Sequence, residues 1–396
     1  MANEPMTERL YYTDPYAREF DARVVRVDKM DGRDVAILDR TAFYPTSGGQ
    51  PFDTGTLGGA SVVDMIDDEA HGVLHVLDTP LAEGQSVQGA IDWDRRFDHM
   101  QQHTGQHVLS AAFDRLLNAR TESFHLGAAS ATIDLSRVVS AAEIAGAEGD
   151  ANRIVWEDRP VAIRFADAAE AAALPLRKES LRGGTLRLID IEGYDISACG
   201  GTHVSQTGAI GVIAVASGEK FRGGTRIEFA CGGRALRAYR GLRDSTAASI
   251  KLLSVLPSEL PVAIERLQTE AKGANRTIRS LQDRLAVHEA DRLAASGGES
   301  HIVVEVLEGW DQTGLKAIAS ALTRRSGYST VLISAPAPSA VVVARAPDAK
   351  TDAAAVLRNL VEEFGGKGGG RPELAQGGGL QGDPQAMAAV ARRLLS

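Results

Sequence analysis

Two histidines on one segment of this chain are matched, about a hundred residues later, by a cysteine and a histidine with the same spacing. His103 and His107 lie in QQHTGQHVLSAAF, and Cys199 and His203 lie in SACGGTHVSQTG. One thiolate among imidazoles is a donor set that fits tetrahedral zinc. Because the two segments are far apart in sequence, a fold and not a local zinc knuckle has to assemble this site.

The first pair of histidines falls in a predicted helix. Residues 100–117 carry an apolar stripe at helical spacing, and both histidines fall on the opposite side of the helix. We expect His99, at the helix start, to be a surface residue or to lie behind the ligands. The second pair flanks Gly200 and Gly201, so that segment is predicted to be a loop between strands. Cys231 is predicted to be a small core residue.

The composition is that of a globular chain of several domains. It has 396 residues, a net charge of −9 and two cysteines, which excludes a disulfide framework and favours the cytoplasm. We expect no signal peptide and no membrane span. The negative charge disfavours general nucleic-acid coating, although residues 218–243 carry a local basic cluster that a solvated helix face would equally explain.

The patterns along the chain predict an α+β fold in four parts. Short Val- and Ile-rich segments over residues 20–93 predict a small N-terminal β-barrel, placed at 1–98. An α+β domain with the candidate metal ligands follows at 99–233, then a helical linker at 234–296. Alternating strand and helix patterns over 297–396 predict a C-terminal α/β domain.

The helical linker carries a heptad seam. Apolar residues with 4-3 spacing run from Leu260 to Leu285, after a break marked by Pro257 and Pro261. An intramolecular helical hairpin and a coiled-coil dimer explain the seam equally well. A homodimer through the 260–288 helix or the C-terminal domain is therefore possible.

Two glycine-rich segments are candidates for ligand contact. TAFYPTSGGQPFDTGTL offers Thr46 and Gln50 around Gly48 and Gly49, although a plain turn between strands is an equal reading. GGKGGGRPELAQGGG is predicted to be a loop between the last two helices. It does not fit a phosphate-binding P-loop, but exposed amides beside Lys367 and Arg371 could bind a phosphate backbone.

Four ordered motifs together resemble a known family. TAFYPTSGGQPFDTG, QQHTGQHVLSAAF, ACGGTHVSQTGAIG and GGTRIEF closely resemble the editing domain of alanyl-tRNA synthetases, which also occurs in the freestanding alanyl-tRNA editing proteins called AlaX. The tail GGKGGGRPELAQGGG is similar to the C-terminal domain that those synthetases share with DHH-family phosphoesterases, and such tails accompany the long AlaX form. We expect no aminoacylation module in this chain.

The resemblance implies a trans-editing hydrolase that deacylates tRNA(Ala) mischarged with serine, with glycine as the second candidate amino acid. One Zn²⁺ per chain would be held by the family's HxxxH and CxxxH residues, here His103, His107, Cys199 and His203. Gly48 and Gly49 match a glycine motif associated with serine discrimination, and Arg222 and Arg226 match a basic strand assigned to the acceptor end. Thr46, Gln50 and Thr202 are the candidate partners of the serine hydroxyl.

Other functions fit the sequence less well. A zinc protease is disfavoured because position 104 is Thr and no Glu lies between the histidines. A DHH-type nuclease lacks its DHH triplet, and threonine-type editing fits the GGTH and GGQ segments poorly. The main alternative is a non-catalytic tRNA-binding protein with a structural zinc, because four protein ligands usually close a zinc site.

Overall fold

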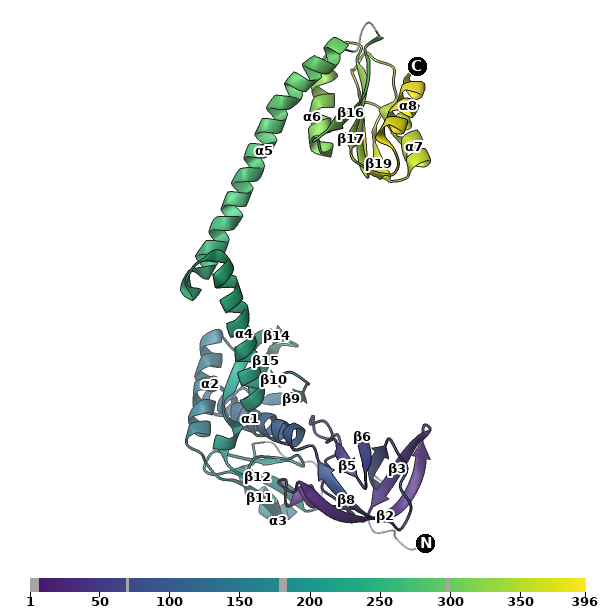
Figure 1. Ribbon diagram of the computed structural model, residues 1–396. Coiled ribbons are helices and arrows are strands. Elements are labelled where there is room, and N and C mark those ends of the chain that lie inside the picture. The colour runs from purple at the N-terminus through teal and green to yellow at the C-terminus, as the bar shows by residue number, and fades with distance from the viewer. Residues whose placement is uncertain (1–6, 69–70, 178–183, 297–299) are drawn as a thin grey trace. The chain divides into compact units, whose positions relative to one another are not determined.

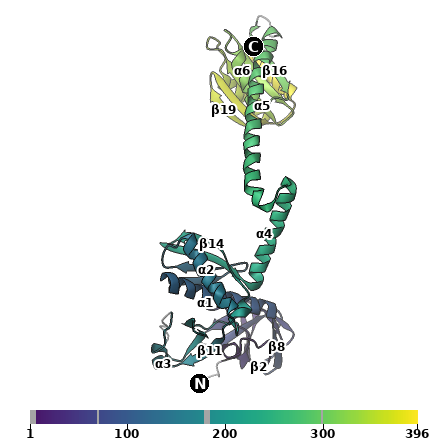
Figure 2. The ribbon, with the colours of Figure 1, turned by 90° about the vertical axis from the view of Figure 1, so that its left-hand side faces the viewer.

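The structure of the chain, a computed structural model, describes residues 7–68, 71–177, 184–296 and 300–396 (Figure 1). It divides into two units, Met1–Ala248 and Ser249–Ser396. Both units contain helices and strands, which confirms the predicted mixture (Figure 2). The four-part division by residue number stays a prediction.

Six antiparallel strands of the first unit close into a barrel. They are β2 (Glu19–Met30), β3 (Arg33–Leu38), β5 (Gly55–Leu57), β6 (Ala60–Asp68), β7 (Gly72–Leu77) and β8 (Ser86–Ile91), in the order β2-β3-β7-β6-β5-β8. Phe20, Val24, Leu38 and Met65 belong to its buried core. The short strands β1 (Glu8–Arg9) and β4 (Arg40–Thr41) pair in parallel, and the 3-10 helix η1 (Leu10–Tyr12) directly follows β1.

Helix α1 (Trp93–Leu117) follows the barrel and begins seven residues before the predicted start at 100. Asp92 caps it by accepting the Arg95 backbone N–H, a signal that the apolar stripe alone does not contain. The helix is buried on both sides over most of residues 99–113. His99 is only 3% exposed, so the expectation of a surface residue is wrong.

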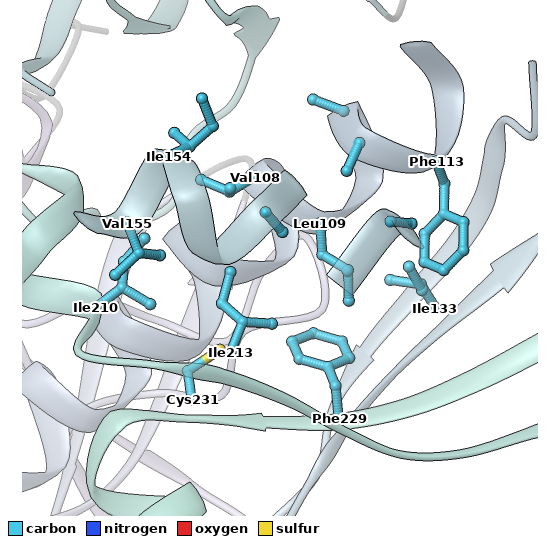
Figure 3. Close-up of a cluster of buried hydrophobic side chains, with 14 of the residues drawn as sticks. Val108, Leu109, Phe113, Ile133, Ile154, Val155, Ile210, Ile213, Phe229 and Cys231 are labelled. Atoms are coloured by element: carbon cyan, nitrogen blue, oxygen red, sulfur yellow. The ribbon is translucent and has the colours of Figure 1, made fainter. Parts of the chain in front are cut away.

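A four-stranded sheet packs against α1 in the largest core of this unit (Figure 3). Its order is β14-β15-β10-β9, made of β9 (Thr121–Leu126), β10 (Ala131–Leu135), β14 (Ile213–Phe221) and β15 (Gly224–Cys231). Val108, Phe113 and Phe229 meet there with Ile154 of α2 (Ala141–Trp156). Cys231 is fully buried in this core, as predicted.

A second sheet leads into the cysteine segment. Strands β11 (Val161–Ala166), β12 (Leu186–Ile191) and β13 (Asp195–Ala198) are antiparallel, and α3 (Ala168–Ala172) follows β11. Cys199 comes directly after β13, and the chain then runs as a loop to η2 (Thr207–Ile210). The predicted loop after a strand is therefore confirmed.

Two helices separated by a break follow the sheets. They are α4 (Gly232–Leu253) and α5 (Leu260–Ser296), with η3 (Pro257–Glu259) at the predicted break. The heptad seam lies on α5, where Ile264, Leu281 and Leu285 are 44%, 49% and 56% exposed. Over the described ranges no single helix is long and apolar enough to cross a membrane. One bent pair of helices, Gly232–Leu253 with Pro257–Ser296, is long and apolar enough when the two are taken together, judged by length and composition only.

The second unit contains a five-stranded sheet with helices on both faces. Its order is β16-β17-β18-β20-β19, from β16 (Ile302–Glu308), β17 (Ser329–Ala335), β18 (Ser339–Arg345), β19 (Lys367–Arg371) and β20 (Leu374–Leu380). Only β16 and β17 pair in parallel. The end of α5 and α6 (Gln312–Leu322) cover one face, and α7 (Ala353–Phe364) and α8 (Pro384–Leu395) cover the other.

The glycine-rich tail corrects a prediction. It is not a loop, because GGKGGGRPELAQGGG supplies the hairpin of β19 and β20. A Cβ at Gly368 would lie 2.6 Å from the Gly377 Cα, and one at Gly370 would lie 2.3 Å from the Ala375 Cα. The glycines therefore permit close approach of two strands, which composition alone does not distinguish from a loop.

Candidate metal centre

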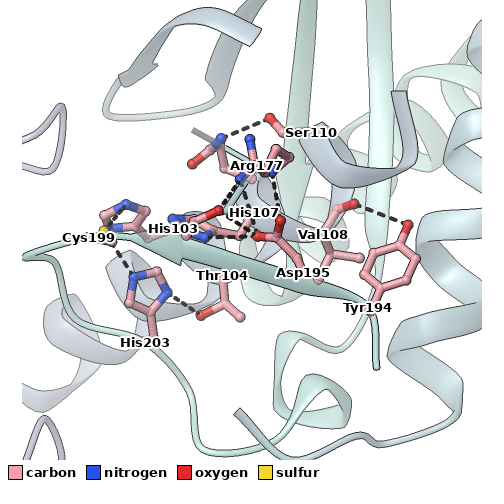
Figure 4. Close-up of polar contacts among 12 residues, drawn as sticks. His103, Thr104, His107, Val108, Ser110, Arg177, Tyr194, Asp195, Cys199 and His203 are labelled. Atoms are coloured by element: carbon pink, nitrogen blue, oxygen red, sulfur yellow. Dashed lines mark hydrogen bonds and ion pairs between the residues drawn. The ribbon is translucent and has the colours of Figure 1, made fainter. Parts of the chain in front are cut away.

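The structure brings the four predicted ligands together in the first unit. His103 and His107 extend from α1, and Cys199 and His203 come from the loop after β13 (Figure 4). One donor atom from each lies within 4.8 Å of all the others. Cys199 Sγ is 3.4 Å from His103 Nε2 and 3.3 Å from His203 Nε2. The four side chains can hold a metal ion.

The second ring nitrogen of each histidine faces a separate polar partner. His103 Nδ1 lies 2.8 Å from Gln50 Oε1, and His203 Nδ1 lies 3.2 Å from Thr104 Oγ1. The Thr104 hydroxyl donates to the Met100 carbonyl, so it accepts from His203. Both rings thus carry hydrogen on Nδ1 and turn the lone pair of Nε2 toward Cys199. Such outer partners are usual for metal-binding histidines.

His107 is paired with a buried carboxylate. Its Nδ1 lies 3.5 Å from Asp195 Oδ2, and Arg177 binds the same carboxylate through Nε at 2.7 Å and Nη2 at 3.2 Å (Figure 4). Burial raises the pKa of Asp195, but the close contact with His107 and the charge of Arg177 outweigh burial and lower it. For His107 burial lowers the pKa, and the close contacts with Asp195 and Cys199 raise it above its usual value. Asp195 is therefore ionised and holds the His107 ring.

The cysteine is set up as a thiolate. Burial raises the pKa of Cys199, but the neighbouring His103 and His203 lower it well below its usual value. Burial lowers the pKa of His203 well below its usual value, so this ring is neutral. A thiolate at Cys199 and a neutral ring at His203 are the protonation states that metal binding requires of these two residues.

The glycine segment reaches the site through a tight turn. Over residues 47–50 the end residues exchange backbone hydrogen bonds, with φ of +56° at Gly48 and +88° at Gly49. A Cβ at Gly49 would lie 2.8 Å from the Phe124 carbonyl oxygen. The Phe124 ring stacks on His103 with centroids 5.4 Å apart. The turn is therefore packed against the metal centre and is more than a plain connection between strands.

The three candidate partners of a substrate hydroxyl differ in their surroundings. Gln50 and Thr202 are fully buried, and the Gln50 amide donates to Thr202 Oγ1 at 2.8 Å and accepts the Thr202 N–H at 3.1 Å. Thr46 is exposed and accepts the Phe52 backbone N–H at 3.2 Å. Gln50 and Thr202 are thus occupied with each other and with His103, and Thr46 is the accessible member.

The predicted basic contacts lie on two hairpins. Arg222 is exposed at the turn between β14 and β15. Arg226 is bound to Asp134 at 2.7 and 2.9 Å and lies 3.6 Å from the centre of the Phe221 ring. In the second unit, exposed strand β19 begins with Lys367 and ends with Arg371, which alternation places on the same face.

Several residues around the site were not predicted. Thr104, Asp195, Arg177 and Arg187 are all buried or half-buried around the four ligands. A signal was present for two of them, because Arg187 and Asp195 interrupt the apolar pattern LRLIDIEGYDISAC. His99 lies one turn before His103 but is outside the group of four, and burial, with Arg95, lowers its pKa to about 4.

Comparison with known proteins agrees with the motifs. Residues 11–95 match the model of tRNA synthetases class II (A), residues 186–228 match the threonyl and alanyl tRNA synthetase second additional domain, and residues 299–396 match the DHHA1 domain. The chain is 34% identical over 392 residues to the alanyl-tRNA editing protein AlaX-L of Pyrococcus horikoshii, covering 94% of each chain. The chain belongs to the AlaX family of alanyl-tRNA editing proteins.

Other relatives of this AlaX chain are larger. The alanine–tRNA ligase of Pyrococcus abyssi is 33% identical over 394 residues, which are 94% of this chain but 42% of that protein. The chain thus spans less than half the length of the ligases it matches. The C-Ala domain of Aquifex aeolicus alanyl-tRNA synthetase is 26% identical, with a TM-score of 0.23, over 24% of this chain and 90% of that one.

Proposed function

We propose that this protein is a trans-editing deacylase that hydrolyses the aminoacyl ester of tRNA(Ala) mischarged with serine, and also with glycine. The observation that carries the proposal is the convergence of His103, His107, Cys199 and His203 within 4.8 Å, each histidine with its own outer partner. Family membership supplies the reaction class, and the geometry supplies the site.

One zinc ion per chain fits these four residues. One thiolate and three imidazoles are a donor set that zinc favours over hard cations. When bound, zinc supplies a Lewis acid that polarises the ester carbonyl and stabilises negative charge on its oxygen. The residues of the chain hold this site rigid: Gln50, Thr104 and Asp195 fix the ring orientations from behind.

An aminoacyl ester needs little further activation. The carboxylate of Asp195, which lies against the ligand His107, is already bound by Arg177. Hydrolysis therefore depends on orientation of the ester and of a water molecule, and on stabilisation of the oxyanion. Phe124 and the glycine turn form one wall at His103 that would orient the aminoacyl group.

Selection of serine over alanine needs a polar partner for the hydroxyl. A site that must hydrogen-bond a substrate hydroxyl is left unsatisfied by alanine, which gives strong discrimination. Of the three predicted partners, we assign the contact to Thr46, because Gln50 and Thr202 are fully buried and bind each other. Gly48 and Gly49, through their positive φ angles, form the tight turn that directly follows Thr46.

The partner is tRNA(Ala), bound in the cytoplasm where translation takes place. Arg222 is free to contact the acceptor end, whereas Arg226 supports the hairpin through Asp134. Lys367 and Arg371 on the exposed strand β19 are proposed to contact the tRNA backbone. The exposed seam of α5 is proposed to form a homodimer, which sedimentation velocity of the full chain would detect.

One experiment tests reaction, selectivity and metal together. Release of the amino acid is measured from Ser-, Gly- and Ala-tRNA(Ala), with and without a zinc chelator. We expect rapid hydrolysis of the first two, retention of Ala-tRNA(Ala), and loss of activity with chelator. A protein that shifts tRNA in a gel but releases no serine would instead be a tRNA-binding protein with a structural zinc.

A further inference from the structure

Arg187 is a buried cation with no ion pair to a carboxylate in the described part of the chain. It lies in strand β12, is 8% exposed, and binds main-chain oxygens instead of a carboxylate. Burying a charge is costly unless other groups compensate it. An arginine in this position therefore needs a reason beyond packing, and its contacts supply one.

The guanidinium forms hydrogen bonds with the loop that carries the cysteine ligand. Arg187 Nη1 donates to the carbonyl oxygens of Cys199 at 2.6 Å and Gly201 at 3.0 Å. The Cys199 backbone N–H donates in return to the Arg187 carbonyl at 3.0 Å. One side chain thus holds the main chain on both sides of Gly200, a residue that gives the loop no stiffness of its own.

The other end of the side chain is anchored on the N-terminal segment. Arg187 Nε donates to the Tyr12 carbonyl at 2.8 Å, and the guanidinium lies 5.5 Å from the centre of the Tyr12 ring. Burial lowers the pKa of Arg187, and the charge of Cys199 is the largest effect that opposes this. Its Nη2 is buried with no hydrogen-bond partner among the described residues, so the hydrogen bonds of the side chain there come from Nε to Tyr12 and from Nη1 to the cysteine loop.

We propose that Arg187 is a positioning residue for the metal centre, which holds Cys199 and the following glycines in the geometry that ligation needs. The inference rests on the proposed metal site. The planar guanidinium reaches the Tyr12 carbonyl through Nε and the two loop carbonyls through Nη1 at the same time, whereas an ammonium group binds as a point charge. Outer partners of metal ligands commonly contribute about 10- to 100-fold in metal affinity.

The test compares Arg187→Lys and Arg187→Met with the wild-type chain. Zinc affinity is measured by competition with a chromophoric chelator, and the thiolate-to-cobalt absorption band is recorded at saturating cobalt. We expect affinity to fall in the order Arg, Lys, Met, with a loss of about 10- to 100-fold for Met and a changed cobalt band. Circular dichroism shows which variants are folded. If Arg187→Met does not fold, the comparison is made with Arg187→Lys, which keeps the positive charge.

Arg345 provides the matched control. It also binds main-chain carbonyls, at 2.7 Å to Ala349 and 3.1 Å to Pro372, but it belongs to the second unit. Arg345→Lys should leave zinc affinity unchanged. If Arg187→Lys binds zinc as the wild type does, positioning by the fork is wrong. If the wild type itself binds no zinc, the proposed function fails as well, so the two failures are distinguishable.

Discussion

Gln50 Oε1 lies 2.8 Å from His103 Nδ1, so a turn between strands β4 and β5 holds a ligand on helix α1. The same amide oxygen accepts the Thr202 N–H, and its Nε2 donates to the Thr202 hydroxyl. Through one buried side chain, the glycine turn, the histidine helix and the cysteine loop are joined. The two distant halves of the metal centre are therefore aligned by a third segment.

Gln50→Met should weaken the metal centre. The substitution leaves His103 Nδ1 and Thr202 without their partner in a buried place, which costs roughly 1–3 kcal/mol in unfolding free energy. Zinc affinity should fall by about 10- to 100-fold. Chelator competition and urea unfolding measure the two effects. Gln102→Met is the control, because Gln102 is equally buried but bonds to the Cys231 backbone; similar zinc loss in both variants would contradict a specific role of Gln50.

Cys199→Ala should abolish zinc binding and deacylation together. Removing the thiolate takes away the soft ligand and leaves three imidazoles. The zinc content of the purified protein and hydrolysis of Ser-tRNA(Ala) are the measurements. Cys231→Ala is the matched change, because this buried thiol lies in the core outside the group of four and should keep both properties. Normal hydrolysis by Cys199→Ala would exclude the zinc assignment.

The sequence identified the four donors but not what surrounds them. His103, His107, Cys199 and His203 stood out because their residue types are rare and regularly spaced. The partners Thr104 and Gln50 are ordinary polar residues, whose contacts depend on how α1 meets the loop after β13. Such contacts between distant segments leave no local periodicity, so a sequence pattern cannot reveal them.

Local signals had the same limits in the fold. Strand patterns over residues 20–93 correspond to observed strands because alternation and turn residues act locally. The start of α1 was missed because three charged residues, 94–96, separate the apolar residues Trp93 and Phe97 that follow the capping residue Asp92. The β19–β20 hairpin was missed because its glycines allow the two strands to approach closely, and the same glycine-rich composition is also typical of a loop.

Gly48→Ala and Gly49→Ala should differ although both residues have positive φ. Each alanine has to adopt a left-handed backbone conformation, which lowers the unfolding free energy by about 1–2 kcal/mol. At Gly48 the new Cβ meets nothing within 4 Å, whereas at Gly49 it would lie 2.8 Å from the Phe124 carbonyl oxygen. Gly49→Ala should therefore displace the turn and lower deacylation strongly, while Gly48→Ala loses mainly stability. Equal kcat/KM for the two variants would show that the contact with Phe124 does not matter.

His75 should make stability depend on pH independently of the metal. It is fully buried in the barrel, with Nε2 2.8 Å from Thr41 Oγ1 and Nδ1 3.1 Å from the Ala36 carbonyl. Burial lowers its pKa from 6.5 to about 4. The unfolded chain therefore takes up this proton first as pH falls, so its contribution is complete above pH 6.5 and is lost toward pH 4.

Replacing His75 should remove this pH dependence. Between pH about 7.5 and about 4.5, the wild type should lose roughly 2–3 kcal/mol more unfolding free energy than His75→Gln. Urea unfolding with a chelator present measures the difference without the metal contribution. The pKa of His99 is also lowered to about 4, but His99 is present in both proteins, so its contribution to the pH dependence is the same in each and cancels in the difference. Parallel pH profiles of the two proteins would mean that His75 is not the neutral, buried imidazole that the barrel contacts indicate.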